Sequence, residues 1–382
     1  MTVMDSRTRL LTAWSFREPD RVPIEIGLAE AARAFPEAQR LVEFVDTQAD
    51  HFRNVSGFDS GFCGLRTAYT EEVIENVPGD YYRLRRVHRT AAGEFHALTK
   101  HQHVTLAPSD YLWERRYIET PDEMIRLADA PREPIPLNLA NLDRCTAELG
   151  NRGLPLVYTL HPLGWLVRNA NLTEVYSWFL AMPEVIHRFL EASNRQVAEA
   201  VAAMGALGTG RYFGVTAHEM LTPPWMGPRL FDEFVFPYDQ HVNDAVHRIG
   251  GRMRAHCHGN CMRYLRQFAE MGIDSLEPLE HAPFGDVDLA AAKRLVGDRM
   301  LLSGNVASQN FLFMSRAEVR REVREAIRAA APGGGFTLRP GGLHGGTDSA
   351  QNADQMLKFL DNIDAYVQAA LDYGAYPIHI RD

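Results

Sequence analysis

The stretch RMRAHCHGNCMRYLRQFAEMGIDSLEPL, residues 252–279, decides the fold class. It opens and closes with short runs that favour β-strands, Arg252–Cys257 and Ile273–Leu279, and the residues between them have a helical pattern. A strand, a helix and a second strand in this order predict a βαβ unit, in which the two strands are parallel.

The same alternation continues on both sides of this stretch. Six further runs favour strands, and most of them precede a helical pattern: Val22–Ile26, Val55–Phe62, Leu154–Leu160, Arg211–Ala217, Met300–Asn305 and Phe336–Leu338. The helix expected at Arg316–Ala330 begins with a capping box made by Ser315 and Glu318. Eight strand and helix repeats predict an α/β protein with a (β/α)8 TIM barrel, and we expect residues 1–382 to form a single barrel domain.

One segment, at about residues 63–152, breaks this rhythm. It contains two extended runs, Tyr82–His88 and Glu94–His101, on either side of a glycine-containing turn at Thr90–Gly93. Two such runs around a turn are typical of a β-hairpin. We therefore expect a β-hairpin insertion after the second strand of the barrel.

Composition excludes several classes of protein. The chain has a formal net charge of -9, which argues against a general binder of nucleic acid or of anionic membranes. No stretch of about 18 apolar residues occurs, so no transmembrane helix is expected. The four cysteines are too few for a disulfide scaffold, which predicts a reducing, cytoplasmic location.

Polar residues follow every predicted strand. Because catalytic groups of TIM barrels lie at the carboxyl ends of the strands, these residues are the candidates for a site. They are, in strand order, Glu25, Asp59, His161, His218 with Glu219, His256 with His258, Glu277 with Glu280, Asn305 and His344. Asp59 and Asn305 could equally be helix caps.

The segment AHCHGNC, residues 255–261, points most directly to a chemistry. His256 and His258 are two residues apart at a strand end, so both side chains lie on one face. Two imidazoles side by side suit one zinc ion or another divalent metal, with a third ligand from His344, Glu219 or a later glutamate. The alternative is that one histidine pairs with a carboxylate as a general acid and that no metal binds.

Two other groups carry weaker signals. Trp225 in the TPPWMG loop could form an aromatic wall for a ring-shaped substrate, although it could also be a packing residue. The HQH motif at residues 101–103 repeats the spacing of the ligand pair, but it lies in the expected hairpin, where we expect it to face solvent.

Five stretches resemble the uroporphyrinogen decarboxylase-like superfamily. They are EPDRVPIEI (18–26), RTAAGE (89–94), GPRLFDEFVFPYDQHVNDAVHRIGGRMRAHCHGN (227–260), LLSGNV (301–306) and the PGGGFTLRPGG…QN run (332–352). The superfamily includes the decarboxylase itself and zinc methyltransferases of corrinoid-dependent methyl transfer. The resemblance implies one (β/α)8 barrel with its site at the carboxyl ends of the strands, and a homodimer.

The resemblance to the decarboxylase is incomplete. AARAFPEA (31–38) resembles part of an arginine-containing stretch that holds the substrate carboxylates, with Arg33 at its second arginine, but Ala29 stands at the first. Asp59 and His344 match the aspartate and the late histidine of that enzyme. Loss of one arginine removes a bidentate contact to a carboxylate, so a substrate with eight carboxylates is disfavoured.

In the methyltransferase branch, zinc is held by a His-x-Cys pair after strand five and a cysteine after strand eight. His256, His258 and His344 occupy the corresponding positions here, so imidazoles would replace both thiolates. Neutral imidazoles leave a metal strongly Lewis acidic, which suits activation of water, a phenol or a carbonyl better than alkylation of a thiol.

Three functions follow as hypotheses. The first is a metal-dependent methyl (C1) transferase or demethylase acting on a small, methylated, aromatic substrate, with a corrinoid protein as partner. The second is a decarboxylase-type lyase acting on a small carboxylated ring, and the third is a non-catalytic binding barrel. We expect catalytic roles for Asp59, Glu219 and His344, substrate binding by Arg33, His161, His218, Trp225 and Asn305, and metal binding by His256, His258 and His344.

Overall fold

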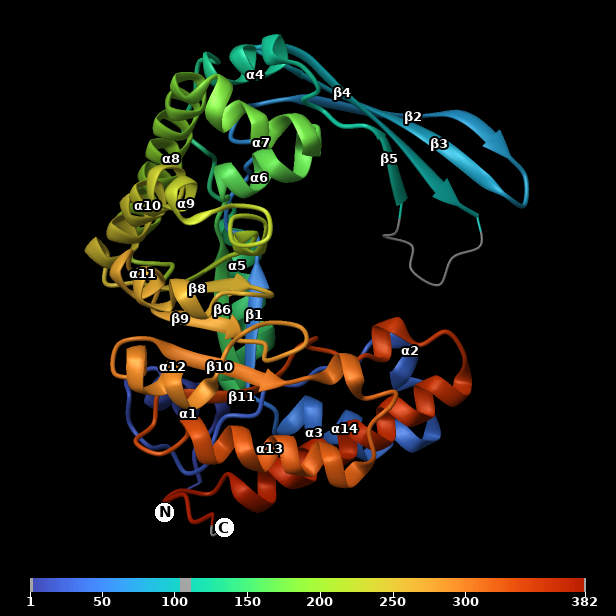
Figure 1. Ribbon diagram of the computed structural model, residues 1–382, viewed down its shortest axis with the longest axis vertical. Helices are drawn as coiled ribbons and strands as arrows, with labels where there is room; N and C mark the ends of the chain where they lie inside the picture. The colour runs from blue at the N-terminus through green and yellow to red at the C-terminus, as the bar shows by residue number, and fades with distance from the viewer. Residues whose placement is uncertain (1–2, 104–110, 381–382) are drawn as a thin grey trace.

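The computed structural model describes residues 3–103 and 111–380. Its centre is a curled sheet of seven parallel strands in the order β1-β6-β7-β8-β9-β10-β11 (Figure 1). These strands are β1 (His51–Val55), β6 (Gly153–Tyr158), β7 (Tyr212–Val215), β8 (Arg252–Cys257), β9 (Ser275–Pro278), β10 (Leu301–Val306) and β11 (Phe336–Pro340). The parallel pairing agrees with the βαβ pattern expected from the sequence.

The extended segment at residues 22–26 lies between the two edges of this sheet. On one side, the backbone N–H of Glu25 donates to the carbonyl of Leu338, and the N–H of Leu338 donates to the carbonyl of Pro23, both at 2.9 Å. On the other side, the N–H of Asp50 donates to the carbonyl of Ile24 at 2.8 Å, immediately before β1. The segment therefore takes the eighth position of a TIM-like barrel, although it is too irregular to be a regular strand.

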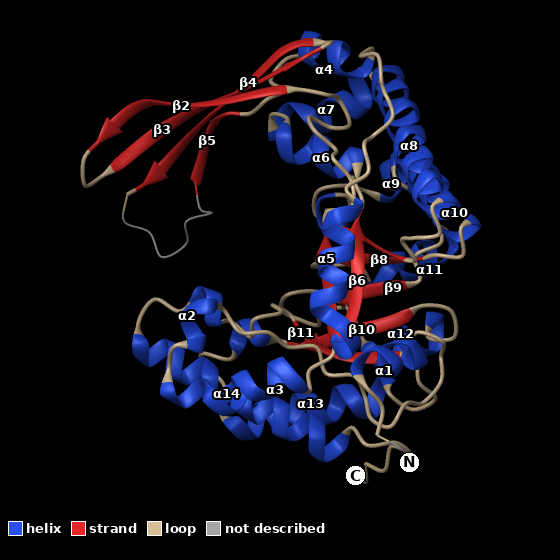
Figure 2. Ribbon diagram, turned by 180° about the vertical axis from the view of Figure 1, so that it is seen from behind, coloured by secondary structure: helices blue, strands red, loops and turns tan. Residues whose placement is uncertain are grey.

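Helices pack around the outside of the parallel sheet (Figure 2). Those that follow β6 to β11 are α6 (Pro162–Asn169), α7 (Leu172–Ala181), α8 (Pro183–Ala206), α9 (Pro228–Phe234), α10 (Phe236–Arg248), α11 (Leu265–Glu270), α12 (Leu289–Val296), α13 (Arg316–Ala330) and α14 (Ala353–Tyr373). The others are α1 (Ser6–Ala13), α2 (Glu30–Arg33), α3 (Gln39–Thr47), α4 (Pro121–Ala128) and α5 (Leu139–Leu149). Short 3-10 turns occur at Pro36–Ala38, Gly150–Arg152, His218–Met220, Met262–Tyr264, Ser308–Asn310 and Thr347–Ser349.

Local sequence explains where these helices begin. The Ser315 hydroxyl accepts a hydrogen bond from the backbone N–H of Glu318, and the Glu318 carboxylate accepts one from the backbone N–H of Ser315, so α13 starts with the predicted capping box. Asn352 caps α14 in the same position. The apolar stripe of α13 is buried, which fixes this helix against β10 and β11.

Side chains fill the interior of the barrel in layers. Trp14, just after α1, closes the amino-terminal end together with Leu154, Leu156 and Leu301, all of them buried. Above them, the buried carboxylate of Glu25 accepts hydrogen bonds from side chains of three strands: Arg254 (2.7 Å), Ser303 (2.7 Å) and Thr337 (2.5 Å). The interior is therefore closed at one end, as in other TIM barrels, and a ligand has access only to the carboxyl ends of the strands.

A four-stranded antiparallel sheet lies between β1 and β6 in the chain. Its order is β2-β3-β4-β5, with β2 (Ala68–Val77), β3 (Tyr81–Thr90), β4 (Gly93–Gln102) and β5 (Tyr111–Arg115). Figure 1 shows that it projects from the end of the molecule near α4, α6 and α7. The sequence predicted two strands here, β3 and β4. It missed β2, whose side chains are almost all exposed, and β5, because neither strand has a simple buried alternation.

The predicted position of the second barrel strand was wrong. The sequence placed it at Val55–Phe62, whereas β1 ends at Val55. Residues 56–62 instead form a loop containing Gly57 and Gly61, of which Gly61 has a φ of 46°. The strand segment HFRNV contains polar residues and gives only a weak strand pattern. The apolar residues that follow it gave a stronger pattern, so the strand was predicted too far toward the carboxyl end of the chain.

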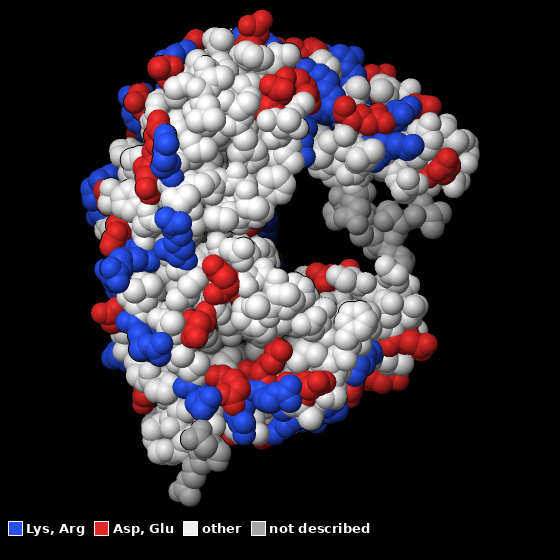
Figure 3. Space-filling view, viewed as in Figure 1, with Lys and Arg blue, Asp and Glu red and all other residues white. Residues whose placement is uncertain are grey.

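The surface carries charges of both signs. On the face drawn in Figure 3, acidic and basic side chains are mixed rather than gathered by sign. No helix of the described residues combines the length and the apolar character that crossing a membrane would need.

Candidate functional site

The ends of β8 and β9 bring a histidine and a glutamate together. His256 lies opposite Glu277 in the parallel register of these strands, so their side chains share the interior face. The imidazole Nδ1 of His256 lies 2.9 Å from Oε1 of Glu277. This carboxylate therefore fixes the orientation of the ring.

His258, two residues further along, forms a second pair of the same kind. Its Nδ1 lies 3.0 Å from Oε2 of Glu280, and the same oxygen accepts the backbone N–H of Gly259 at 3.0 Å. The hydrogen bond to Glu280 raises the pKa of His258, which outweighs the lowering effect of burial. The ring centroids of His256 and His258 are 4.4 Å apart and the rings are nearly perpendicular.

In both histidine–glutamate pairs the same ring nitrogen, Nε2, is left available for a ligand. Because the carboxylates of Glu277 and Glu280 occupy the Nδ1 atoms, each imidazole keeps its Nε2 for another partner, and none is present among the described residues. Metal-binding histidines commonly have one nitrogen held by a carboxylate in this way, while the other nitrogen binds the ion. The adjacent placement of His256 and His258 therefore agrees with the sequence expectation.

Glu277 connects this site to the charges inside the barrel. Its Oε2 lies 3.1 Å from the Arg339 guanidinium, which in turn lies 3.6 Å from Glu25. Burial alone would raise the pKa of Glu277, but the charges of Arg339 and His256 outweigh it and hold this pKa well below its ordinary value. Glu277 is therefore an anion that orients His256 and is not free to act as a general base.

Glu219 reaches the same region from the turn His218–Met220 after β7. Arg168 on α6 donates to Oε1 of Glu219 at 2.7 Å. Oε2 of Glu219 is buried, and no described residue donates a hydrogen bond to it. Burial raises the pKa of Glu219, but a hydrogen bond from its own backbone N–H and the charge of His256 lower it overall. An ionised oxygen without a partner remains beside the histidines.

The third predicted metal ligand, His344, lies apart from the other two. Its Nδ1 is 3.5 Å from Oδ2 of Asp348, and its ring packs so closely on Gly27 that a Cβ there would lie 2.9 Å from the His344 Cδ2. Within the described residues, no contact joins His344 to His256 or His258. The loop after β11 therefore holds His344 against the first barrel segment.

His161 and His218 form a separate buried cluster with Asp239 of α10. His161 Nε2 lies 2.9 and 3.1 Å from the two Asp239 oxygens, and His218 Nε2 lies 2.8 Å from Oδ2. Across residues 3–103 and 111–380, this is the single group of three potential metal ligands whose ligand atoms all lie within 4.8 Å. Both histidines, predicted to bind substrate, point Nε2 at a buried carboxylate; Nδ1 of His161 accepts from the Gly164 N–H, and Nδ1 of His218 has no partner among the described residues.

Two decarboxylase-type candidates are not assembled with the histidine pairs. Asp59 is exposed, and the contact recorded for it is a backbone hydrogen bond to Pro136. Arg33 donates to both oxygens of Asp46, at 2.8 and 3.2 Å, so its guanidinium already has a carboxylate partner. Among the described residues, no hydrogen bond or ion pair joins Asp59, Arg33 and His344 to one another.

Trp225 lies beside the loop that carries Glu219. Its ring stacks on Tyr176 at a centroid distance of 6.0 Å and an angle of 14°, and 47% of its surface is exposed. The Tyr176 hydroxyl donates to the carbonyl of Met220, the residue after Glu219, at 2.8 Å. This half-exposed ring offers an apolar surface next to the polar groups.

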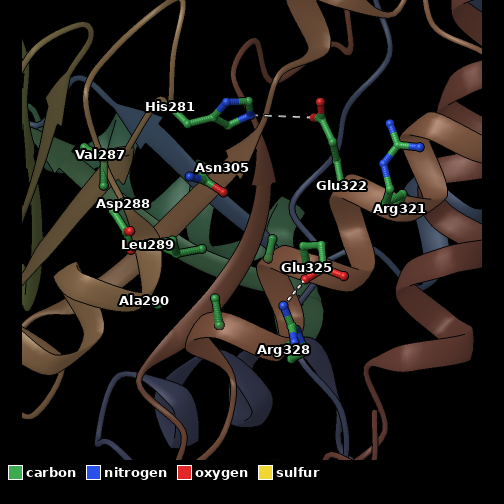
Figure 4. A pocket seen from close by; sticks show the side chains of 12 residues that line it. His281, Val287, Asp288, Leu289, Ala290, Asn305, Arg321, Glu322, Glu325 and Arg328 are labelled. Atoms are coloured by element: carbon green, nitrogen blue, oxygen red, sulfur yellow. Dashed lines mark ion pairs between the residues drawn. The ribbon is translucent and has the colours of Figure 1, made fainter. Parts of the chain in front are cut away.

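Asn305 faces a different cavity. It lines a groove of about 610 Å³ between α12 and α13, together with His281 and Glu322; Nε2 of His281 and Oε2 of Glu322 are 3.7 Å apart (Figure 4). Two of the strand-end candidates are therefore not on the surface of the barrel opening: Asn305 lines this outer groove, and His161 is buried.

Sequence reasoning missed Tyr158 and Thr216. Tyr158 ends β6 and is partly exposed, and its hydroxyl is hydrogen-bonded to the Thr216 hydroxyl just after β7. The alternation Leu154, Leu156, Tyr158 was the available signal, because the first two residues lie in the barrel interior and the third must share their side. Tyr158 therefore contributes a phenol at the open end of the barrel.

Fold and site together define a class: a TIM-like α/β barrel with histidine–carboxylate pairs where its strands end. The uroporphyrinogen decarboxylase (URO-D) family model matches residues 128–376, and the chain belongs to this family. A curated uroporphyrinogen decarboxylase from Aeromonas salmonicida (strain A449) is 27% identical over 183 residues, which are 46% of this chain and 48% of that protein. The chain thus matches about half the length of this relative.

A solved structure with a similar fold is a methyltransferase from Methanosarcina mazei. The TM-score is 0.58 with 16% sequence identity, and the match covers 97% of this chain and 99% of that one. At this identity the similarity concerns the fold. The family therefore rests on the URO-D model, and the structural match agrees with the barrel fold.

Proposed function

We propose that the protein is a metal-dependent methyl (C1) transferase or demethylase that acts on a small, methylated, aromatic substrate. The observation that carries this proposal is the pair of adjacent imidazoles, His256 and His258, each held at Nδ1 by its own carboxylate and each with Nε2 available.

The donor set fits a divalent metal in one further respect. The buried Oε2 of Glu219 lacks a hydrogen-bond donor, and an ionised oxygen in that state is stabilised by a cation. We assign His256, His258 and Glu219 as the ligands, and leave out His344 because it pairs with Asp348. Their ligand atoms do not all lie within 4.8 Å of one another in this structure, so binding of one ion would draw the three side chains together. Two imidazoles and a carboxylate suit zinc, and equally iron, manganese or cobalt.

A bound ion would act as a Lewis acid on an oxygen of the substrate. The residues of the chain supply the remaining functions. Trp225, stacked on Tyr176, presents an apolar face for an aromatic ring. The Tyr158 hydroxyl can hold or pass a proton through Thr216. Arg168 keeps Glu219 ionised and turned toward the histidines.

Methyl transfer also requires an acceptor for the methyl group. We propose that a corrinoid-carrying protein takes this role, because the sequence resembles methyltransferases that deliver a methyl group to or from such proteins. The closed amino-terminal end of the barrel supports an approach by the partner at the carboxyl ends of the strands. Mixing the chain with a free corrinoid and a methoxylated aromatic compound would test this step by the change in corrinoid absorption.

Decarboxylation is the second candidate, and the family match favours it. Its expected working groups, Asp59, Arg33 and His344, have no hydrogen bond or ion pair with one another among the described residues, and Arg33 is bound to Asp46. A porphyrinogen or small aromatic acid that releases carbon dioxide without added metal would establish this function instead. A protein with neither metal nor turnover would be a binding barrel.

The deciding experiment is metal analysis of the purified protein and of its variants. We expect one divalent ion per chain, and at least a tenfold loss of affinity in His256→Ala and in His258→Ala. His241→Ala, which removes an exposed imidazole on α10, is the matched control and should keep the ion. Metal-free protein after supply of zinc, or full occupancy in both site variants, would reject the proposal.

A further inference from the structure

Asp239 is a buried carboxylate that no step of the proposed reaction uses. It lies in the first turn of α10 and accepts N–H groups from two histidines of different loops, His161 and His218. Burial alone would raise the pKa of Asp239, but the two histidines outweigh it and hold this pKa far below its ordinary value. Asp239 is thus an anion at a junction between α10, the end of β6 and the end of β7.

The hydrogen bonds identify this cluster as a network and not as a metal centre. The backbone N–H of Gly164 donates to Nδ1 of His161 at 2.9 Å, so the ring proton of His161 must be on Nε2, which faces Asp239. A metal on Nε2 would require the proton on Nδ1 instead. The adjoining cavity of about 10 Å³ holds at most a single water and has no room for a substrate.

Each histidine controls an element that carries one half of an ion pair. His161 is the N-cap of α6, the helix that bears Arg168. His218 begins the turn that bears Glu219. Arg168 donates to Glu219 at 2.7 Å. Asp239 therefore holds both of the elements that carry this ion pair, α6 through His161 and the turn through His218.

The backbone between these elements leaves little freedom. Ala217, just before His218, has a φ of 89°, a conformation that residues with a side chain rarely adopt unless their surroundings hold them in it. A Cβ added to Gly164 would lie 2.4 Å from the Ala217 Cβ, so the start of α6 is in direct contact with this turn. The position of Glu219 therefore depends on a strained turn that is held in place by the hydrogen bond between His218 and Asp239.

We propose that Asp239 is a positioning residue: through His161 and His218 it sets the relative placement of Arg168 and Glu219, and so directs the free Glu219 oxygen to the ion. The inference rests on the proposed function for its last step. The placement of the turn does not depend on a metal and can be measured in its absence.

The test replaces Asp239 with asparagine, which is similar in size but cannot accept two N–H groups on equivalent anionic oxygens. The matched control is Asn243→Ala, which removes a buried hydrogen bond to the Met271 carbonyl one turn further along the same helix. In metal-free protein, amide hydrogen exchange of residues 217–221 should become at least tenfold faster in Asp239→Asn and stay unchanged in Asn243→Ala. Unchanged exchange in Asp239→Asn would overturn the positioning role.

Cobalt(II) added to the same proteins supplies the second measurement. Asp239→Asn should bind it 10- to 100-fold more weakly than wild type and with an altered visible spectrum, whereas Asn243→Ala should bind it as wild type does. His218→Gln, whose amide can donate from the position of Nε2, should recover part of the affinity that His218→Leu loses. Equal affinity and spectrum in Asp239→Asn and wild type would refute the link to Glu219.

Two further outcomes separate the proposals. If wild type binds no cobalt while exchange in Asp239→Asn accelerates, the proposed function fails and the positioning of the turn stands. If Asp239→Asn abolishes cobalt binding while His256→Ala keeps it, the ion occupies the Asp239 cluster, and the positioning role is overturned.

Discussion

Replacing Glu25 with glutamine should destabilise the barrel from its centre. Glu25 is 3% exposed, and Arg254, 4% exposed, donates to it at 2.7 Å, while Ser303 and Thr337 donate to its other oxygen. With Arg339 and Glu277, the interior holds two buried cations and two buried anions. The substitution leaves one buried cation without a compensating charge.

The expected cost follows from that imbalance. Breaking a buried ion pair by removing one partner costs about 3–5 kcal/mol, and we expect about 3 because the glutamine oxygen still accepts hydrogen bonds. Unfolding entropy of about 2.1 cal/mol/K per residue makes 3 kcal/mol equal to about 4 °C in melting temperature for this chain. Differential scanning calorimetry of Glu25→Gln and wild type would measure the shift.

The control for Glu25→Gln is Glu325→Gln on the surface of α13. Glu325 pairs with Arg328 at half-exposed positions, and such pairs contribute about 0–1 kcal/mol. The two variants should therefore differ by several degrees. A melting temperature of Glu25→Gln within 1 °C of wild type, or equal to that of Glu325→Gln, would refute the view that this charge cluster supports the barrel.

Three further predictions follow from separate features. Gly164→Ala should lower the melting temperature, because its Cβ would lie 2.4 Å from that of Ala217; a Gly227→Ala variant, which meets no atoms and has an ordinary φ of -81°, is the steric control, and equal melting temperatures would contradict the clash. Hydrogen bonding to Asp274 raises the pKa of His247, so the stability that this pair contributes is complete below the unfolded pKa of about 6.5 and is lost as pH rises through the folded pKa. His247→Ala should therefore lower the melting temperature at pH 5.5 more than at pH 8.5, and an equal loss at both would show that the pair has no such linkage. Trp225→Ala should raise KM for an aromatic substrate severalfold with a smaller change in kcat, as steady-state kinetics would reveal, and an unchanged KM would remove Trp225 from the substrate site.

The barrel was predictable because its signal is repeated. β8 has the predicted bounds, and five of the other predicted strands coincide with observed ones to within a few residues. The exceptions are the second strand and Val22–Ile26, which is extended but is not a regular strand. The antiparallel sheet was only half predicted, since most β2 side chains are exposed and alternation in burial is the signal that sequence reading relies on.

The candidate site was predictable where it depends on strand geometry. His256 and His258 lie on consecutive positions of one face, so the spacing alone placed them together. His344 follows β11 in a loop that turns it toward Asp348, whereas Asn305 lies within β10 and lines an outer groove. His161 and His218 are hydrogen-bonded to Asp239 because α10 packs against the ends of β6 and β7. Such a contact between distant segments cannot be predicted from a local sequence pattern.

The closed amino-terminal end of the barrel has a kinetic consequence. Trp14 and the Glu25 cluster block the interior, so there is one entrance and no separate exit. A methyl donor and a methyl acceptor would then have to use the same opening. Direct transfer needs both molecules at once, so the small donor would enter first and the acceptor second, and excess acceptor would inhibit by covering the entrance.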